Sequence, residues 1–221
     1  MRALIIGNSD GIGLALTHRL LAAGWEVTGL SRRAAPAGTA IVADVTSPDF
    51  PAAVAKAGDV DLCVYAAGIG DPIENDDLAP QTRALEVNLI GAARTCEVLV
   101  PRMLAAGNGH IIGLSSLADA MLSPEAPGYA ASKAGLTSYL LGLDAAVRPR
   151  GVAITTVRFG FVDTKMAKSP VTPFKITPEK AVDVLMRCIR TRPAIVSYPR
   201  RMAAVTATLG PLLRTAARLR R

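Results

Sequence analysis

Short apolar segments alternate with longer helical patterns along almost the whole chain, and this alternation constrains the fold more than any other feature. A repeated strand–helix order predicts parallel strands with helices on both faces of the sheet. Most of the strand segments are continuous apolar runs, as expected for a sheet that is covered on both sides. The expected strands are Ala3–Ile6, Glu26–Leu30, Thr39–Val42, Leu62–Ala66, His110–Ser115, Ala153–Arg158 and Ala194–Ser197.

The expected helices lie between these strands. They are Ile12–Ala23, Phe50–Ala57, Thr82–Ala106, Tyr129–Val147 and Pro178–Arg190. Gly24, Gly107 and Gly151 follow three of the helical patterns, where a left-handed residue commonly ends a helix. A length of 221 residues suits one well-buried domain and is short for two. The sequence therefore predicts an α/β fold with a doubly wound, parallel, seven-stranded sheet in a single domain.

The composition argues against several classes of protein. Hydrophobic residues make up 50% of the chain and charged residues 19%, which argues against a disordered protein. No apolar run approaches the ~18 residues of a membrane span, and the periodic pattern begins at Ala3, so we expect no signal peptide. Cys63, Cys96 and Cys188 lie far apart in apolar segments without metal-ligand spacing. We expect free thiols, no metal site and a cytoplasmic protein.

The net charge of +7 is concentrated at the C-terminal end. After Asp183 the chain has nine arginines and no acid, so residues 1–183 sum to −2. Aromatic residues are only 4% of the chain, and none is interleaved with the arginines of the last twenty residues. This pattern argues against nucleic acid as a partner.

The last twenty residues have a helical period. Apolar residues recur there at spacings of three and four beside several arginines, which predicts a basic amphipathic helix, and Pro211 should kink or divide it. The apolar stripe is Met202, Val205, Leu209, Leu212, Ala216 and Leu219, and the arginines are Arg201, Arg214, Arg218, Arg220 and Arg221. We expect a domain at residues 1–200 and a helical extension at 201–221. The extension packs on its own domain or on a second subunit, or it contacts an anionic membrane surface or a partner.

A glycine-rich turn follows the first strand and opens the first helix. Its sequence is Gly7-Asn8-Ser9-Asp10-Gly11-Ile12-Gly13. Glycines let the backbone approach a pyrophosphate, and the helix N-terminus offers unpaired N–H groups with a partial positive charge. By itself such a turn can also be a plain connection between a strand and a helix.

The end of the second strand bears on which dinucleotide would bind. Enzymes that use NAD place an acid there, roughly 20 residues after the turn, to bind the ribose hydroxyls. Here Ser31 is followed by Arg32 and Arg33, and guanidinium groups pair well with a 2′-phosphate. NADP(H) is therefore favoured. Asp10 in the turn is a contrary sign, so NAD(H) stays open, and the two arginines alternatively belong to a solvated loop.

Ser116 and the pair Tyr129 and Lys133 form a second pattern. Tyr129 and Lys133 are four residues apart on an expected helix, so their side chains share one face. A nearby ammonium favours the phenolate and lowers a tyrosine pKa from its usual value of about 10. A serine hydroxyl can donate to an oxygen on which negative charge develops. With a dinucleotide nearby, these residues predict hydride transfer at a carbonyl carbon with Tyr129 as acid/base.

These motifs, in this order and spacing, resemble the short-chain dehydrogenase/reductase family over nearly all of residues 3–200. Besides the motifs above, the matching segments are Asp44-Val45, Ala66-Ala67-Gly68, Asn88 and Phe159-Gly160-Phe161-Val162-Asp163-Thr164. The resemblance implies that Asp44 and Val45 contact the adenine, and that Lys133 also holds the nicotinamide ribose. It further implies that Asn88 holds a water that links Lys133 to solvent, and that Gly160, Val162 and Thr164 lie beside the cofactor.

The resemblance also implies a Rossmann fold and an NADP(H)-dependent oxidoreductase that reduces a carbonyl or oxidises the matching alcohol. It implies a homodimer or homotetramer assembled through the helices that contain Asn88 and Tyr129. Phe159 departs from the family pattern, which has proline there. The expected substrate is a small or hydrophobic carbonyl under a short lid that includes Pro170, Val171, Pro173 and Phe174, in a pocket lined by Met121, Leu122, Phe161 and Met166. The alternative is a non-catalytic, dinucleotide-binding regulatory protein that acts through its C-terminal tail.

Overall fold

The sheet is parallel and doubly wound, as the sequence predicts. The computed structural model describes the backbone of residues 1–166 and 172–219, and the side chains of 1–166, 172–210 and 215. Within this part of the chain, seven strands form one parallel sheet in the order β3-β2-β1-β4-β5-β6-β7. The strands are β1 (Arg2–Ile6), β2 (Glu26–Ser31), β3 (Thr39–Val42), β4 (Leu62–Tyr65), β5 (Gly109–Ser116), β6 (Val152–Phe159) and β7 (Ile195–Tyr198).

The helices connect these strands and cover the sheet. They are α1 (Gly11–Ala22), α2 (Phe50–Ala55), α3 (Ala79–Leu85), α4 (Gly91–Ala106), α5 (Pro127–Val147), α6 (Pro178–Thr191) and α7 (Arg200–Leu219). Three shorter turns are the π turn η1 (Glu86–Ile90) and the 3-10 turns η2 (Leu117–Ala120) and η3 (Arg148–Arg150). Gly24, Gly107 and Gly151 have positive φ angles, as expected for residues that end helices.

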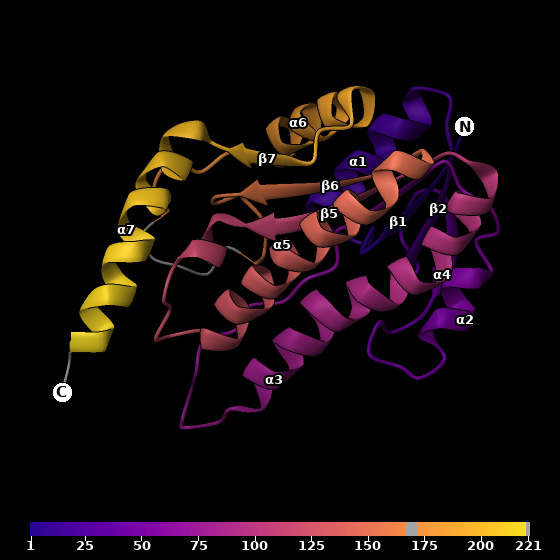
Figure 1. Cartoon of the computed structure of the whole chain (residues 1–221). Coiled ribbons are helices and arrows are strands. Elements are labelled where there is room, and N and C mark those ends of the chain that lie inside the picture. Colours follow the sequence, from indigo (N-terminus) through magenta and orange to yellow (C-terminus); the bar gives the residue numbers. More distant parts are fainter. Residues whose placement is uncertain (167–171, 220–221) are drawn as a thin grey trace.

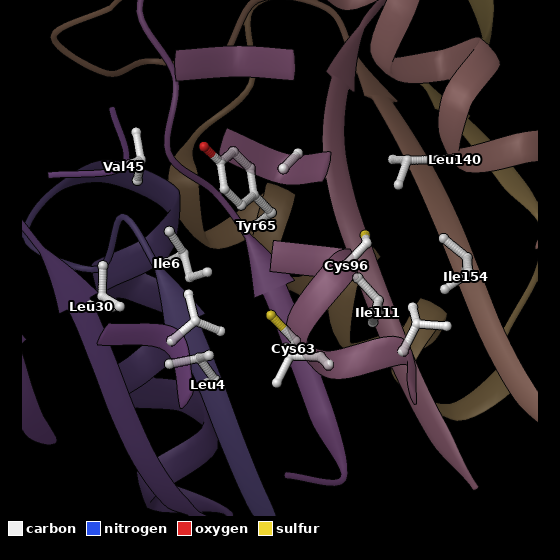
Figure 2. Close-up of a cluster of buried hydrophobic side chains, with 14 of the residues drawn as sticks. Leu4, Ile6, Leu30, Val45, Cys63, Tyr65, Cys96, Ile111, Leu140 and Ile154 are labelled. Carbon is white, nitrogen blue, oxygen red and sulfur yellow. The ribbon is translucent and has the colours of Figure 1, made fainter. Parts of the chain in front are cut away.

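Two apolar clusters hold the layers together. α1 and α6 pack on one face of the sheet, and α2, α4 and α5 pack on the other (Figure 1). Figure 2 shows part of the second cluster, where Cys96 of α4 and Leu140 of α5 lie above strand residues such as Ile111. All three cysteines are buried free thiols, as the sequence predicts. Burial of apolar side chains on both faces explains the continuous apolar strands.

The strand order reverses between β1 and β4. The chain leaves β1 toward β2 on one side of the sheet, and it leaves β4 toward β5 on the other. In open α/β sheets this reversal opens a crevice at the carboxyl ends of the two strands, where ligands bind. The glycine turn after β1 and the segment Ala66–Gly68 after β4 therefore meet at this crevice.

The helix expected at Thr82–Ala106 is not continuous, which corrects the prediction. It begins at Ala79 and contains the π turn η1 between α3 and α4. The Gly91 N–H bonds to the Glu86 carbonyl, five residues back, while the Val87 carbonyl accepts a bond from the Tyr65 hydroxyl at 2.5 Å. A single wide turn hardly alters a helical hydrophobic pattern, so the sequence did not reveal it. Such turns are frequent at functional sites, and η1 contains Asn88.

Helix α7 lies beyond the carboxyl ends of β5, β6 and β7 (Figure 1). It runs past Pro211 as one helix, so the expected division is wrong. Gly210 precedes the proline, and its missing Cβ relieves the clash that usually drives that residue out of a helix. The Met202 sulfur lies against Gly160, and Gly210 lies against the Ala120 carbonyl.

The rest of the amphipathic pattern in α7 is only partly described. Val205 and Leu209 of the apolar stripe are exposed. The side chains of Leu212, Arg214, Ala216, Arg218 and Leu219, and the whole of Arg220 and Arg221, lie outside the described residues. No helix in the described part of the chain is both long enough and apolar enough to cross a bilayer.

Candidate active site

The glycine turn is packed so closely that it excludes side chains at two positions. Gly7 has a φ angle of +88°, and a Cβ added to it would lie 2.6 Å from the Ala67 nitrogen. A Cβ added to Gly13 would collide with the Gly7 carbonyl. Asp10 ends the turn in an extended conformation, and its carboxylate accepts a hydrogen bond from the Gly11 N–H at 2.8 Å. This bare backbone at the start of α1 is a cradle that fits a dinucleotide pyrophosphate.

The remaining turn residues differ in where they lie. Asn8 is buried, with its amide against Gly29 of β2 and its oxygen 3.3 Å from the Ser31 hydroxyl. The Ser31 hydroxyl also lies 2.6 Å from the Arg33 carbonyl. Asn8 and Ser31 therefore connect the turn to the loop after β2 with their side chains. Ser9 and Ile12 are half-buried at the mouth of the turn.

Charged groups surround the outer end of the crevice. The pKa of Asp44 is lowered mainly by a hydrogen bond from the Thr46 backbone N–H at 2.9 Å. The Thr46 hydroxyl and the charges of Arg83 and Arg32 lower it further. Arg83 lies 3.3 Å from the Asp44 carboxylate, an ion pair that the sequence did not reveal. Arg32 and Arg33 are exposed, and Val45 beside Asp44 is buried.

A second ion pair links the turn to the segment after β6. The Lys165 ammonium lies 2.6 Å from the Asp10 carboxylate, and this hydrogen bond is the main cause of the lowered pKa of Asp10. Thr164 lies against Gly11, since a Cβ added to that glycine would be 3.3 Å from Cγ2 of the threonine. Thr164 is therefore at the cradle, as expected. Both charged side chains of the ion pair are largely exposed.

Asn88 is completely buried and fully engaged by the protein. Its oxygen accepts from the Ile69 N–H at 2.8 Å, and its nitrogen donates to the Ile69 carbonyl at 2.8 Å and to the Ser132 hydroxyl at 2.9 Å. Asn88 thus joins the loop after β4 to α5. The sequence predicts that Asn88 holds a water. In the structure, the side-chain amide holds the backbone of that loop, and the water at Asn88 stays a prediction.

Ser116 and Tyr129 come together at the carboxyl end of β5. The Ser116 hydroxyl oxygen accepts a bond from the Ala118 N–H at 3.1 Å, which leaves the hydroxyl hydrogen to donate elsewhere. Burial raises the pKa of Tyr129, a hydrogen bond with Ser116 opposes this, and the Asp119 carboxylate raises it further. We expected Lys133 to lower this pKa, but in the structure burial outweighs any such effect. The tyrosine ring packs against Gly70.

Lys133 is buried beside the same groups. Its ammonium donates to the Leu114 carbonyl at 2.8 Å and lies 5.7 Å from the centroid of the Tyr129 ring. Burial lowers the pKa of Lys133 to about 8. A Cβ added to Gly68 would lie 3.2 Å from the Asn88 oxygen and 3.5 Å from the Lys133 nitrogen. The structure therefore brings the four expected catalytic residues around one end of the crevice.

The segment after β6 returns to the sheet near the same place. Val162 pairs with Ile176 in a short parallel bridge, and Gly160 contacts α7 through Met202. Of the expected pocket residues, Met121 and Phe161 are half-buried, while Leu122 and Met166 are exposed. Pro170 and Val171 of the expected lid lie outside the described residues, and Pro173 and Phe174 are exposed.

The sequence analysis did not predict two buried polar features. The Gln81 side chain donates to the Asp71 carbonyl at 2.9 Å and accepts from the Gly128 N–H at 3.1 Å, which fixes the start of α5. Asp119 and Arg158 form an ion pair next to the expected catalytic residues. A charged residue inside the apolar strand Val152–Phe159 is the one signal that could have indicated this pair.

Comparison with known proteins agrees with these motifs. A family model described as short chain dehydrogenase matches residues 1–173. An uncharacterised oxidoreductase of Myxococcus xanthus is 31% identical, over 92% of this chain and 89% of the relative. A fatty acyl-CoA reductase of Acinetobacter baylyi is 30% identical, over 95% and 80%.

A solved structure has the same architecture. It is a short chain dehydrogenase from Burkholderia cenocepacia in complex with NADP, which superimposes with a TM-score of 0.85 at 27% identity and covers 100% of this chain and 97% of its own. The glycine cradle, the crevice and these relatives lead to one conclusion. The chain belongs to the short-chain dehydrogenase family of NAD(P)-dependent oxidoreductases.

Proposed function

We propose that the protein is an NADP(H)-dependent carbonyl reductase, or an alcohol dehydrogenase in the reverse direction. The observation that carries this proposal is the grouping of Ser116, Tyr129 and Lys133 at the carboxyl end of β5, beside the crevice that contains the glycine cradle. A hydroxyl donor, a phenol and an ammonium at one place are the groups that reduction of a carbonyl to an alcohol requires.

Each residue has a distinct part in the reaction. A bound nicotinamide dinucleotide supplies the hydride for reduction or accepts it for oxidation. Ser116 donates a hydrogen bond to the substrate oxygen, where negative charge develops. Tyr129 then gives its proton to that oxygen, and burial keeps the phenol protonated at neutral pH by raising its pKa. Lys133, held by the Leu114 carbonyl, stabilises the phenolate that remains.

Return of the proton to Tyr129 involves Lys133 and Asn88. Lys133 has a pKa of about 8, so it can release and regain a proton close to neutral pH. Asn88 contributes by fixing the loop after β4 next to the Lys133 ammonium, because its own amide is bonded to Ile69 and Ser132. In this proposal a water held at Asn88 links Lys133 to solvent.

The cofactor is NADP(H) in this proposal. Arg32 and Arg33 are exposed at the end of β2, where the 2′-phosphate would lie, and positions 31–33 contain no acid that would repel it. The relative from Burkholderia cenocepacia was solved in complex with NADP, which agrees with this choice. The pyrophosphate would lie on the bare backbone of Gly7–Gly13, and Asp44 and Val45 would border the adenine.

The substrate is a small or hydrophobic carbonyl compound. Met121, Phe161 and Met166 are apolar and lie in segments that border the catalytic residues, and Met166 reaches Gly68. The relative from Acinetobacter baylyi is named a fatty acyl-CoA reductase, which makes acyl thioesters and long-chain aldehydes worth testing. The protein assembles as a homodimer or homotetramer through α4 and α5, with α7 as an extension of a catalytic domain at residues 1–200.

The test is NADPH oxidation across ketones, aldehydes, quinones, acyl-CoA thioesters and 3-oxoacyl thioesters, with NADH in parallel. Turnover by the native protein should fall at least about a hundredfold in Tyr129→Phe, which removes the proton donor. Tyr139→Phe is the matched control, because Tyr139 lies in the same helix ten positions further on. NADPH binding without turnover of any substrate would instead favour the regulatory alternative, in which α7 makes the functional contact.

A further inference from the structure

A buried ion pair lies next to the expected catalytic residues. Asp119 belongs to the η2 turn, three residues after Ser116, and Arg158 lies in β6 opposite Ser115. Arg158 Nε donates to Asp119 Oδ2 at 2.7 Å and Nη2 donates to Oδ1, so the guanidinium holds the carboxylate at two points. Arg158 Nη1 also donates to the Ser197 hydroxyl at 3.2 Å. The side chains of Asp119 and Arg158 are only 5% and 20% exposed.

Further hydrogen bonds connect this ion pair to the catalytic helix. Thr137, one turn after Lys133 in α5, donates to Asp119 Oδ2 at 2.7 Å. The Thr137 hydroxyl lies 2.7 Å from that of Ser115, which donates to the Lys133 carbonyl at 3.1 Å. Because an isolated buried charge is very costly, such a pair persists only where its hydrogen bonds are satisfied. The pair therefore joins β6, η2 and α5 in one rigid unit.

The ion pair can act on the reaction in two ways. First, Ser116 caps η2 through its bond from the Ala118 N–H, so anchoring Asp119 in the same turn fixes the position of the Ser116 hydroxyl. Second, the Asp119 carboxylate disfavours the Tyr129 phenolate. The bound guanidinium of Arg158 offsets that charge.

The groups that face Tyr129 come from several elements. Lys133 lies on the same helix, Asp119 comes from η2, the neutral Ser116 hydroxyl comes from the end of β5, and the backbone of Gly70 covers the ring. Lys133 and Asp119 are opposite in charge. The charge balance at the phenol therefore depends on whether Asp119 is neutralised.

We propose that the Asp119–Arg158 ion pair is a positioning element of the catalytic centre, which fixes Ser116 and cancels the charge of Asp119 at Tyr129. This inference rests on the proposed role of Tyr129 as acid/base. Neither residue touches the substrate, so both act through Ser116 and Tyr129. Arg158 in this role explains why a charged residue stands in the largely buried strand β6.

The experiment follows the ionisation of Tyr129 without any substrate. The protein is labelled with 3-fluorotyrosine, whose phenol titrates at lower pH than tyrosine, and the Tyr129 fluorine resonance is assigned by its loss in Tyr129→Phe. Arg158→Met should raise the Tyr129 titration midpoint by about half a pH unit or more, because Asp119 then loses its guanidinium partner. Asp119→Asn should lower the midpoint, because Arg158 is then unpaired. The double variant should return close to the native midpoint.

Opposite shifts that cancel in the double variant are the signature of charge, which a merely structural role would not produce. The matched control is Arg148→Met, which breaks the ion pair with the equally buried Asp144 in the same helix but away from Tyr129. This substitution should lower the free energy of unfolding and leave the titration midpoint of Tyr129 unchanged. If Arg158→Met does not fold, Asp119→Asn carries the test, since its side chain has the same size.

The outcomes separate this inference from the proposed function. Shifts of the predicted signs in a protein that reduces no carbonyl would support the ion pair's influence on Tyr129 and count against the reductase. Turnover that depends on Tyr129, together with equal midpoints in Asp119→Asn and the native protein, would overturn the inference alone. A midpoint that moves in the same direction in both single variants would also overturn it.

Discussion

Replacing Lys133 by methionine should stabilise the protein at neutral pH while it removes activity. Burial lowers the pKa of Lys133 from 10.5 to about 8, because the folded protein disfavours the ammonium. The difference between these two pKa values corresponds to about 3 kcal/mol, which the charged lysine costs the folded state below pH 8. Methionine has a similar length and carries no charge.

Part of this gain is lost with a hydrogen bond. The Lys133 ammonium donates to the buried Leu114 carbonyl at 2.8 Å, and leaving that acceptor without its donor costs about 1 kcal/mol. The expected net effect of Lys133→Met at neutral pH is therefore an increase of about 2 kcal/mol in the free energy of unfolding. Enzymes commonly sacrifice stability at catalytic positions in this way.

The pH dependence distinguishes this cause from better packing. Lysine in the unfolded chain binds more protons than Lys133 in the folded protein between its two pKa values, so the native protein gains stability as pH rises from about 8 to 10.5. At about pH 10 most of the desolvation cost is gone, and the advantage of the variant should shrink to about zero.

Urea unfolding of the native protein and of Lys133→Met, at neutral pH and at about pH 10, measures both effects. NADPH-dependent turnover measured in parallel should be lost in the variant at both pH values. A variant that is less stable than the native protein at neutral pH would refute the reasoning. An advantage that stays constant with pH would refute it as well, because charge would then not be the cause.

Three further predictions concern other parts of the chain. Burial lowers the pKa of His110 to about 4, so the unfolded chain binds more protons than the folded protein between pH 6.5 and 4. The protein should therefore lose about 3 kcal/mol of stability as the pH falls through that range, and thermal unfolding of His110→Leu should lack this loss. Gly7→Ala, which combines positive φ with a clash, should abolish NADPH binding by calorimetry and cost about 2–4 kcal/mol of stability. Gly142→Ala, where a Cβ meets nothing within 4 Å, should be neutral or stabilising. Alanine at both Arg32 and Arg33 should weaken NADPH binding about tenfold or more and leave NADH binding unchanged; equal losses for both cofactors would remove the 2′-phosphate assignment.

The fold was largely predictable because its central strands are buried on both faces. All seven expected strands are present, and no boundary differs from the expected one by more than one residue. Gly7 and Gly13 were predictable as a cradle because a backbone this close to other backbone tolerates no side chain. The motif at Tyr129 and Lys133 was readable because helical spacing fixes which residues share a face.

The features that escaped prediction depend on contacts between distant segments. The π turn at Glu86–Ile90 depends on Tyr65, whose hydroxyl bonds to the Val87 carbonyl from β4. The raised pKa of Tyr129 depends on burial, which no spacing of residues encodes. Pro211 indicated a broken helix from local rules, whereas the helix continues through it; the preceding glycine has no Cβ to clash with the proline, which removes one of the obstacles.

Buried polar groups near the two ends of β5 differ in how completely they are hydrogen-bonded. At the amino end of β5, His110 bonds to Thr155 through one nitrogen, while Nδ1 has no partner among the described residues. At the carboxyl end, Ser115, Asp119 and Arg158 all have hydrogen bonds. A fully bonded polar network holds its members in one geometry, whereas a neutral histidine with one bond contributes only to packing. The carboxyl end is also where the proposed proton transfer from Tyr129 demands a fixed donor, so the bonded network there holds the groups that the proposed chemistry requires.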